Sequence, residues 1–160
     1  MIKNATELSV KIMKKSFFIK IFFIYLFIIS DGLAKQQNYI EEGIKLYKEK
    51  KFNESKVFFE RDLVFNPKSE KSYLYLAKIF DKNENKEELE VNLNNVLLIN
   101  PKNDEAIYML TILKIEQSDY EKAKELIDQF VLICESFCSK KDEIQEKFEK
   151  LNPENAETKN

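Results

Sequence analysis

Histidine and tryptophan are absent from this chain of 160 residues, and glycine occurs only as Gly32 and Gly43. Without histidine, a Ser-His-Asp or Cys-His mechanism has no base, and a histidine-ligated metal site has no ligands. With so few glycines, the sequence also lacks the glycine-rich loop that cradles phosphate groups. We therefore expect no enzyme, no metal site and no cofactor.

Arginine is also scarce, because Arg61 is the only one in the chain. The 26 lysine and arginine residues nearly balance the 28 acidic residues, and the part that follows residue 34 is mildly acidic. A nucleic-acid binder would carry a basic stripe rich in arginine, so we expect no nucleic-acid partner. A chain that is 44% hydrophobic and 34% charged has the composition of a single domain that folds in water.

The longest apolar run lies near the amino terminus, over residues 17–29, and only Lys20 interrupts it. It is too short to cross ~30 Å of hydrocarbon as a helix, which takes roughly 20 apolar residues. The small residues Gly32 and Ala34 follow, at the two positions that a signal peptidase reads. The pattern predicts a signal peptide over residues 1–34, cleaved after Ala34, and hence export to the periplasm or cell envelope.

Three alternatives concern this amino-terminal region. Met13 is an alternative translation start to Met1, because Lys14 and Lys15 follow it directly and would form the basic start of a signal peptide. The apolar run could also be retained as a membrane anchor, which is the one way in which we expect the chain to meet a membrane. A buried core helix is less favoured, because residues 17–29 are apolar all round and offer no polar face.

An internal repeat follows the apolar run. Asn66-Pro67-Lys68 and Asn100-Pro101-Lys102 recur 34 residues apart. Aligned on this period, three units carry small, aromatic or aliphatic residues at equal offsets, namely Tyr39, Gly43, Leu46, Ser55 and Phe59, then Tyr73, Ala77, Phe80, Leu89, Leu93 and Val96, then Ile107, Thr111, Ala123, Ile127 and Phe130. Residues 36–134 therefore resemble three tandem tetratricopeptide repeats, each a helix-turn-helix unit.

The resemblance implies an all-α fold, a right-handed α-solenoid with units over residues 36–69, 70–103 and 104–137. Within the tetratricopeptide domain of residues 35–151, we predict helices over 36–49, 53–65, 70–81, 86–99, 104–116, 119–134 and 140–151. The last of these is amphipathic and would cap the exposed end of the solenoid. Residues 152–160 have almost no apolar side chains and are predicted to be a disordered tail.

Small residues are expected where the two helices of a unit cross closely, and Gly43, Ala77 and Thr111 occupy that place. Ser55 and Ala123 face the same crossings from the second helix. Several positions depart from the family pattern, namely Glu42, Asp62, Leu89, Lys114, Phe130 and Glu135, the last of which stands where a third proline is expected.

In the tetratricopeptide family, the first helix of each unit lines a concave groove. The resemblance implies that the groove residues here are Ile40, Ile44, Tyr47, Lys48, Leu74, Lys78, Asp81, Lys82, Tyr108, Ile112, Ile115 and Glu116. This row is apolar at both ends, which suggests a helix or an extended apolar segment of another protein as ligand. The alternative is that Ile112 and Ile115 are covered by the preceding helices or by self-association.

Cys134 and Cys138 are four residues apart, near the junction of the last two predicted helices. A disulfide is one interpretation, but on a continuous helix its geometry would be poor. Two free, half-buried thiols are the favoured interpretation. Two thiols without histidine do not make a metal site.

Taken together, the sequence predicts an exported adaptor that binds another protein or peptide segment in its groove. A holdase-like chaperone in the periplasm is an alternative, and so is a membrane-tethered assembly subunit. Three repeats are about the minimum for a self-supporting solenoid, so a homodimer that extends the stack is also compatible with the sequence.

Overall fold

The computed structural model describes residues 39–151, and this part of the chain is all-α. A first helix over residues 39–48 is followed by α2 (Phe52–Phe65), α3 (Glu70–Lys82), α4 (Lys86–Ile99), α5 (Asp104–Glu116), α6 (Tyr120–Ile133), a 3₁₀ turn η1 (Cys138–Lys140) and α7 (Lys141–Leu151). The predicted signal peptide, the alternative start at Met13 and the predicted tail lie outside the described residues. No helix within residues 39–151 is both long and apolar enough to span a membrane.

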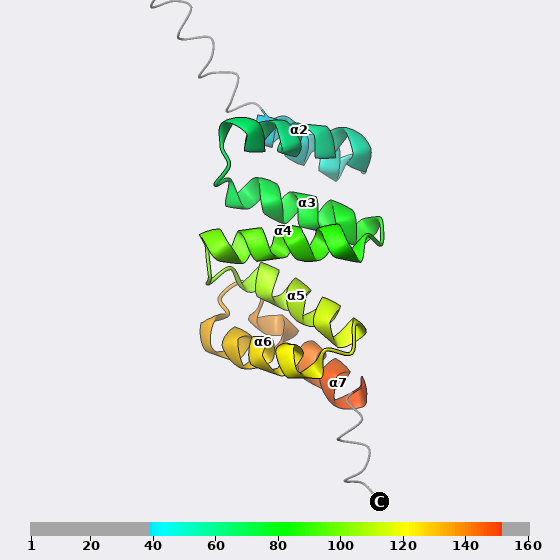
Figure 1. The fold of residues 1–160 in the computed structure, drawn as a ribbon, viewed down its shortest axis with the longest axis vertical. Coiled ribbons are helices and arrows are strands. Elements are labelled where there is room, and N and C mark those ends of the chain that lie inside the picture. Colours follow the sequence, from blue (N-terminus) through cyan, green and yellow to red (C-terminus); the bar gives the residue numbers. More distant parts are fainter. Residues whose placement is uncertain (1–38, 152–160) are drawn as a thin grey trace, which may run out of the picture.

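The helices stack as an elongated α-solenoid (Figure 1). Each helix packs against its neighbours in sequence, α2 on α3, α3 on α4, α4 on α5 and α5 on α6, and α7 closes the end by packing on both α5 and α6. The turns that follow α2, α4 and α6 lie along one edge of the stack, and the α3–α4 and α5–α6 turns lie along the other (Figure 1). The predicted fold class is confirmed, and the observed helix bounds differ from those predicted by at most one residue wherever both ends are described.

The 34-residue period is visible in the backbone as well as in the sequence. Lys50, Glu84 and Ser118 follow the first helix of each unit, and each has a left-handed backbone with φ of 61°, 56° and 61°. This conformation closes the turn into the second helix, and for a residue with a Cβ it costs roughly 1 kcal/mol or more. The backbone therefore has the same small conformational strain at the corresponding turn of each of the three units.

Substituting glycine at these turns should raise stability. Lys50→Gly and Ser118→Gly are each expected to increase the free energy of unfolding by about 0.5–1 kcal/mol, because glycine adopts φ near +60° without steric cost. Urea denaturation measures the change. Lys45→Gly is the matched control: Lys45 is exposed in the interior of the first helix, so the same substitution should lower stability by about 1 kcal/mol. A loss of stability at all three positions would contradict this account of the turns.

The helix crossings use the small residues that the sequence predicts there. Gly43, Ala77 and Thr111 are buried, as are Ser55 and Ala123 opposite them. A Cβ atom on Gly43 would lie 2.9 Å from both Cε1 and Cζ of Phe59, whose ring is fully buried. The Ser55 hydroxyl donates a hydrogen bond of 2.8 Å to the Gly43 carbonyl and links the two crossing helices. In the first unit, the first helix and α2 therefore approach each other closely at Gly43.

Two departures from the family pattern are accommodated by polar contacts. Asp62 is 1% exposed, and the Ser72 hydroxyl donates a hydrogen bond of 2.5 Å to its carboxylate. The Ser69 hydroxyl donates in turn to the Ser72 oxygen at 3.0 Å. A short chain of hydrogen bonds therefore satisfies the buried carboxylate and joins α2 to α3.

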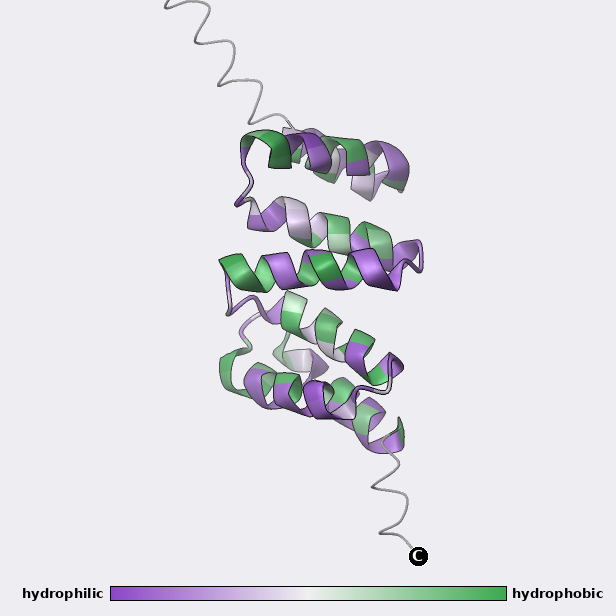
Figure 2. Cartoon of the chain, in the orientation of Figure 1, coloured by the Kyte–Doolittle hydropathy of each residue, from purple (hydrophilic) through white to green (hydrophobic). Residues whose placement is uncertain are grey.

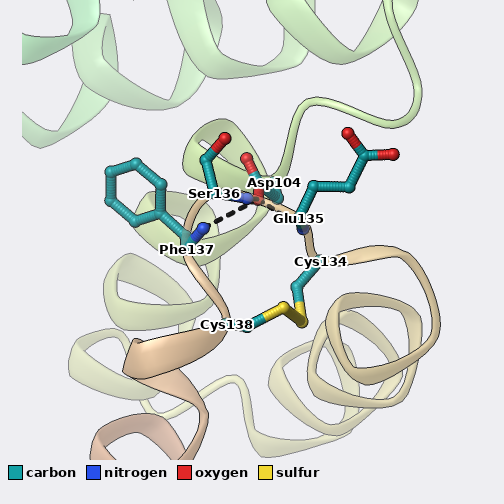
Figure 3. The surroundings of a disulfide bond; sticks show 6 residues. All are labelled: Asp104, Cys134, Glu135, Ser136, Phe137 and Cys138. Carbon is teal, nitrogen blue, oxygen red and sulfur yellow. Dashed lines mark hydrogen bonds between the residues drawn. A yellow bond between two sulfur atoms is a disulfide. The ribbon is translucent and has the colours of Figure 1, made fainter.

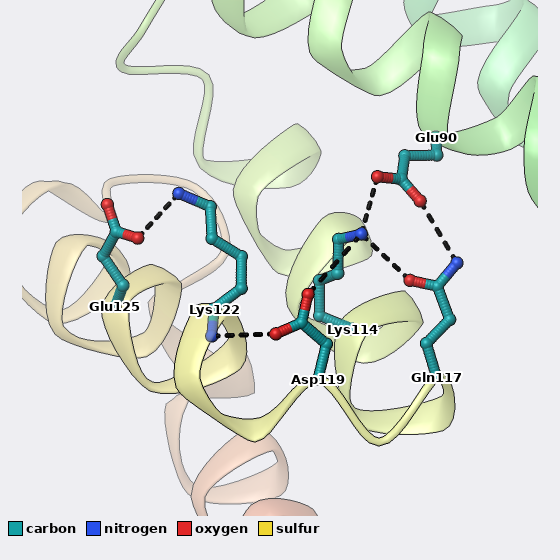
Figure 4. A network of polar contacts seen from close by, with 6 residues as sticks. All are labelled: Glu90, Lys114, Gln117, Asp119, Lys122 and Glu125. Atoms are coloured by element: carbon teal, nitrogen blue, oxygen red, sulfur yellow. Dashed lines mark hydrogen bonds and ion pairs between the residues drawn. The ribbon is translucent and has the colours of Figure 1, made fainter.

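Lys114 replaces an aromatic residue and ties α5 to α4 (Figure 4). Its ammonium lies 2.6 Å from Oε1 of Glu90 and 3.0 Å from Oε1 of Gln117. The Gln117 amide donates to the other Glu90 oxygen at 3.1 Å, and Asp119 lies 3.9 Å from the ammonium. The pKa of Glu90 is lowered, and the hydrogen bond from Lys114 is the largest cause, so the carboxylate stays charged and paired.

Candidate binding site

The first helix contributes less free surface to the predicted groove than its sequence indicates. Ile40, Ile44 and Tyr47 are half-buried, and only Lys48 is fully exposed. The Tyr47 ring packs edge-on against Tyr75 with ring centroids 5.2 Å apart, and Ile44 also packs on the hydrophobic core. At the predicted groove, these side chains are thus partly covered.

The middle unit places its groove residues on α3. Leu74 and Lys78 are half-buried, whereas Asp81 and Lys82 are exposed. The Lys78 ammonium forms an ion pair of 2.8 Å with Glu105 on α5 and lies 5.0 Å from the centre of the Tyr75 ring. Lys78 is therefore already neutralised, and it is poorly suited to bind an anion from a partner.

The third unit is largely covered by the capping helix. The Tyr108 hydroxyl donates a hydrogen bond of 2.6 Å to Glu143 on α7, and its ring packs on Phe137 at 5.8 Å between centroids. Burial, followed by the hydrogen bond to Glu143, raises the pKa of Tyr108 to about 12. Ile115 is only 1% exposed. Its predicted place in an open groove is wrong, because the side chain is almost completely buried.

A pocket of about 390 Å³ lies between α3, α4 and α5. Its lining includes three of the predicted groove residues, Asp81, Ile112 and Glu116, and six that were not predicted, Phe80, Glu84, Lys86, Leu89, Met109 and Leu113. The floor is apolar and the rim is charged. A pocket of this size can take one or two apolar side chains of a ligand.

The rim of the pocket has an acidic side. Asp81, Glu84 and Glu116 contribute carboxylates, and Lys86 contributes the one ammonium among the lining residues. Glu116 is occupied, because Lys86 lies 3.2 Å and Lys147 lies 3.0 Å from its oxygens. Burial alone would raise the pKa of Glu116, but hydrogen bonds from the two lysines outweigh it and lower the pKa. Asp81 has only a long ion pair of 3.8 Å with Lys82, and Glu84 forms no ion pair within residues 39–151, so Glu84 above all is available to attract a positive charge on a ligand.

Four of the six missed residues lie in or near the α3–α4 turn, and the other two, Met109 and Leu113, lie within α5. Glu84 and Lys86 lie in or next to the α3–α4 turn, whereas the sequence analysis assigned the groove to the first helices alone. Phe80 and Leu89 have the periodicity of core residues and are almost buried. The left-handed turn at Glu84 brings these groups together, and the 34-residue repeat of that turn is the signal that could have indicated it.

The turn between α6 and α7 positions the capping helix, and it contains the two cysteines (Figure 3). Cys134 and Cys138 form a disulfide with their Cα atoms 5.2 Å apart, so the favoured interpretation of two free thiols is wrong. Helix α6 ends at Ile133. The two cysteines therefore span a turn, where the Cα separation needed for a disulfide is reached.

Asp104, at the start of α5, holds the same turn by a different means (Figure 3). Its Oδ2 atom accepts hydrogen bonds from the backbone N–H groups of Glu135, Ser136 and Phe137 at 2.8, 2.6 and 2.9 Å. Glu135 stands where the family has proline, which has no N–H to donate. The missing third proline is thus explained by this hydrogen bond.

Asp104 should also make stability depend on pH. Burial would raise its pKa, but the three backbone N–H donors outweigh burial and lower the pKa. A carboxyl with a depressed pKa in the folded state stabilises the protein above its unfolded pKa of about 3.9, and this contribution is lost as the pH falls through the folded pKa.

Asp104→Ala is therefore expected to lower the free energy of unfolding by about 1–2 kcal/mol at neutral pH, because three donors lose their acceptor. The difference from the wild type should shrink as the pH is lowered below the unfolded pKa of about 3.9 and through the lower folded pKa. Urea denaturation at several pH values measures both. Asp104→Asn keeps one acceptor oxygen, so it should lower the free energy of unfolding by less than Asp104→Ala does. A difference that is unchanged at acidic pH would contradict the assigned charge.

No family model matches the sequence, and no curated protein matches it significantly. Solved structures do resemble it. A chain of the CopN-Scc3 complex has a TM-score of 0.61 with 18% identity, over 69% of this chain and 67% of that chain. The C-terminal TPR-containing domain of a Plasmodium falciparum protein described as FK506-binding has a TM-score of 0.61 with 21% identity, over 78% and 90%.

The Sgt2 TPR domain from Aspergillus fumigatus has a TM-score of 0.62 with 15% identity, over 74% of this chain and 82% of that domain. At these identities the comparisons establish the fold. The chain is an α-solenoid of tetratricopeptide repeat units, as the 34-residue period predicts.

Proposed function

We propose that this protein is an exported interaction module that binds a segment of another protein in the pocket between α3, α4 and α5. The observation that carries the proposal is the pocket itself, which combines an apolar floor with a charged rim. The occupant is an apolar side chain that is followed or preceded by lysine or arginine. The apolar side chain would contact Met109 and Ile112, and the cation would face Asp81 and Glu84.

Two observations support export. The sequence of residues 14–34 has the order of a signal peptide, with a basic start, an apolar run and small residues at the cleavage site. The Cys134–Cys138 disulfide suits an oxidising compartment such as the periplasm or cell envelope. A holdase-like chaperone and a membrane-tethered assembly subunit remain the alternative roles.

Selection of displayed peptides on the full chain tests the proposal. Peptides enriched on the wild-type protein should contain an apolar residue next to lysine or arginine. Glu84→Lys should reduce their affinity by about tenfold or more, because an exposed rim carboxylate becomes a cation that repels the ligand. Ile112→Asp, which places a charge in the pocket floor, should abolish binding.

Val91→Asp is the matched control, because Val91 is half-exposed on α4 and does not line the pocket. It should leave binding unchanged. Circular dichroism would show that Glu84→Lys and Val91→Asp keep the helices. Enrichment of the same peptides on wild type and Glu84→Lys would refute the pocket as the binding site. Suppression of aggregation of several unrelated unfolded proteins would favour the chaperone alternative.

A further inference from the structure

Three large aliphatic side chains project from equivalent positions of the three units. Val64, Leu98 and Leu132 are spaced by 34 residues and are 77%, 82% and 83% exposed. Each lies at the carboxyl end of the second helix of its unit, and Phe65, 62% exposed, lies beside Val64. Figure 2 shows these helix ends in green along the edge where α2, α4 and α6 lead into the following turns.

A single exposed leucine is ordinary, but exposed apolar groups in register along one edge indicate a contact surface. We call Val64, Phe65, Leu98 and Leu132 the apolar edge. It is separate from the candidate pocket, because Glu84 and Lys86 belong to the turn at the opposite ends of the helices (Figure 1). A partner on the apolar edge would leave the pocket open.

Unpaired cations accompany the apolar edge. Arg61 lies on α2, Lys68 and Lys102 lie in the turns after α2 and α4, and Lys71 begins the next helix. None of these four forms an ion pair with another residue of the described range 39–151.

The carboxylates at the same edge are mostly occupied. Glu70 accepts hydrogen bonds from the side chains of Asn100 and Asn103 at 2.9 and 2.6 Å, and Asp104 holds the α6–α7 turn. The third turn differs, because Glu135 stands there and is exposed. Over the first two units, the four cations outnumber the carboxylates of Glu70 and Asp104, which keep their charge because their donors are neutral, so the edge combines apolar side chains with net positive charge.

The chain also enters the solenoid at this edge. The Tyr39 ring, where the described residues begin, stacks on the Phe65 ring with centroids 6.0 Å apart and planes 7° apart. Residues 30–38 link Tyr39 to the apolar run of residues 17–29, and an extended linker of this length reaches at most about 30 Å. In the membrane-tethered alternative, where the run is retained, it would bring the apolar edge close to the lipid surface; after cleavage at Ala34 the edge would have to bind the membrane through its own side chains.

We propose that the apolar edge docks on the surface of a membrane that contains anionic lipids. Valine, leucine and phenylalanine side chains would enter the boundary between headgroups and acyl chains, and Lys68, Lys71 and Lys102 would contact lipid phosphates. A lipid surface fits better than a single protein segment, because the apolar groups and the cations are spread along the stack instead of lining a groove. The proposal does not depend on the pocket and extends beyond it.

Tryptophan fluorescence of the full chain tests this docking, since the natural sequence contains no tryptophan. Leu98→Trp places a probe on the apolar edge, and Glu87→Trp places one near the opposite end of the same helix. Both proteins carry the same amino-terminal run, so any tether acts on both alike. The probes are mixed with vesicles of phosphatidylcholine and phosphatidylserine that contain lipids brominated on the acyl chains.

Quenching of the Leu98→Trp protein should exceed that of the Glu87→Trp protein by about twofold or more, and it should weaken in vesicles of phosphatidylcholine alone. Adding Lys68→Glu and Lys102→Glu to Leu98→Trp should remove most of the difference. Unchanged helicity would show that the variants remain folded. Equal quenching of the two tryptophans, or quenching of the Leu98→Trp protein that survives the charge reversals, would overturn the proposal. Binding of an acidic peptide at the apolar edge, with no quenching of Leu98→Trp fluorescence by the vesicles, would overturn it as well.

Discussion

Ser72→Ala is expected to lower the free energy of unfolding by about 2–3 kcal/mol, although it removes a single oxygen atom. The Ser72 hydroxyl donates the 2.5 Å hydrogen bond to Asp62, and both side chains are almost completely buried. Without the hydroxyl, the carboxylate would stay in the interior with no side-chain donor from the described residues. Removing one partner of a buried charged hydrogen bond costs far more than the bond itself contributes.

The double variant Asp62→Ala/Ser72→Ala separates this cause from a general loss of packing. The Ser69 hydroxyl loses its acceptor in both variants, but in the double variant no buried carboxylate is left without its donor, so the double variant should be more stable than Ser72→Ala alone. Urea denaturation of the wild type, the two single variants and the double variant measures the coupling. If the losses in the free energy of unfolding of the two single variants simply add in the double variant, the buried hydrogen bond is not the reason that Ser72→Ala is destabilising.

Gly43→Val should have a comparable effect, lowering the free energy of unfolding by about 2–3 kcal/mol. Any Cβ at this position would lie 2.9 Å from the ring of Phe59, which also stacks on Tyr75 with ring centroids 5.0 Å apart. The ring has no free space to move into, because it is fully buried. The gain in helix propensity over glycine is less than about 1 kcal/mol and does not offset the clash.

A smaller side chain at Phe59 should relieve the clash. Phe59→Leu alone should destabilise the protein through the cavity it leaves, but in the Gly43→Val background the same substitution should cost less or restore stability. Glu41→Val is the matched control, because Glu41 is exposed on the same helix and should change stability by less than about 1 kcal/mol. An equal loss for Glu41→Val and Gly43→Val would contradict the close crossing.

The sequence predicts the parts of this structure that repeat. The two Asn-Pro-Lys motifs determine the 34-residue period and the helix ends, and the small residues Gly43, Ala77 and Thr111 indicate where helices cross. These features are local or are shared by neighbouring units, so residue type and spacing reveal them. The burial of all three crossing residues confirms that prediction.

The end of the solenoid was harder to predict, because it depends on how α7 packs. Ile115 has the spacing of a groove residue, yet it is buried, and α7 packs on the helix that carries it. Cys134 and Cys138 lie close only because α6 ends at Ile133, and the residue that holds this turn, Asp104, is distant in sequence. The pocket likewise combines α3, the α3–α4 turn and α5, and the periodicity of a single helix does not show such a combination.

The account rests on capture of a partner through the pocket, and purification from the protein's own cells tests this most directly. The full chain carries an affinity tag at its carboxyl terminus and is compared with the Glu84→Lys variant, while mass spectrometry records the intact mass and the companions. The account predicts a mature chain that begins at Lys35 and one stoichiometric companion that is lost with Glu84→Lys. The same companions with both proteins, or none with the wild type, would contradict it.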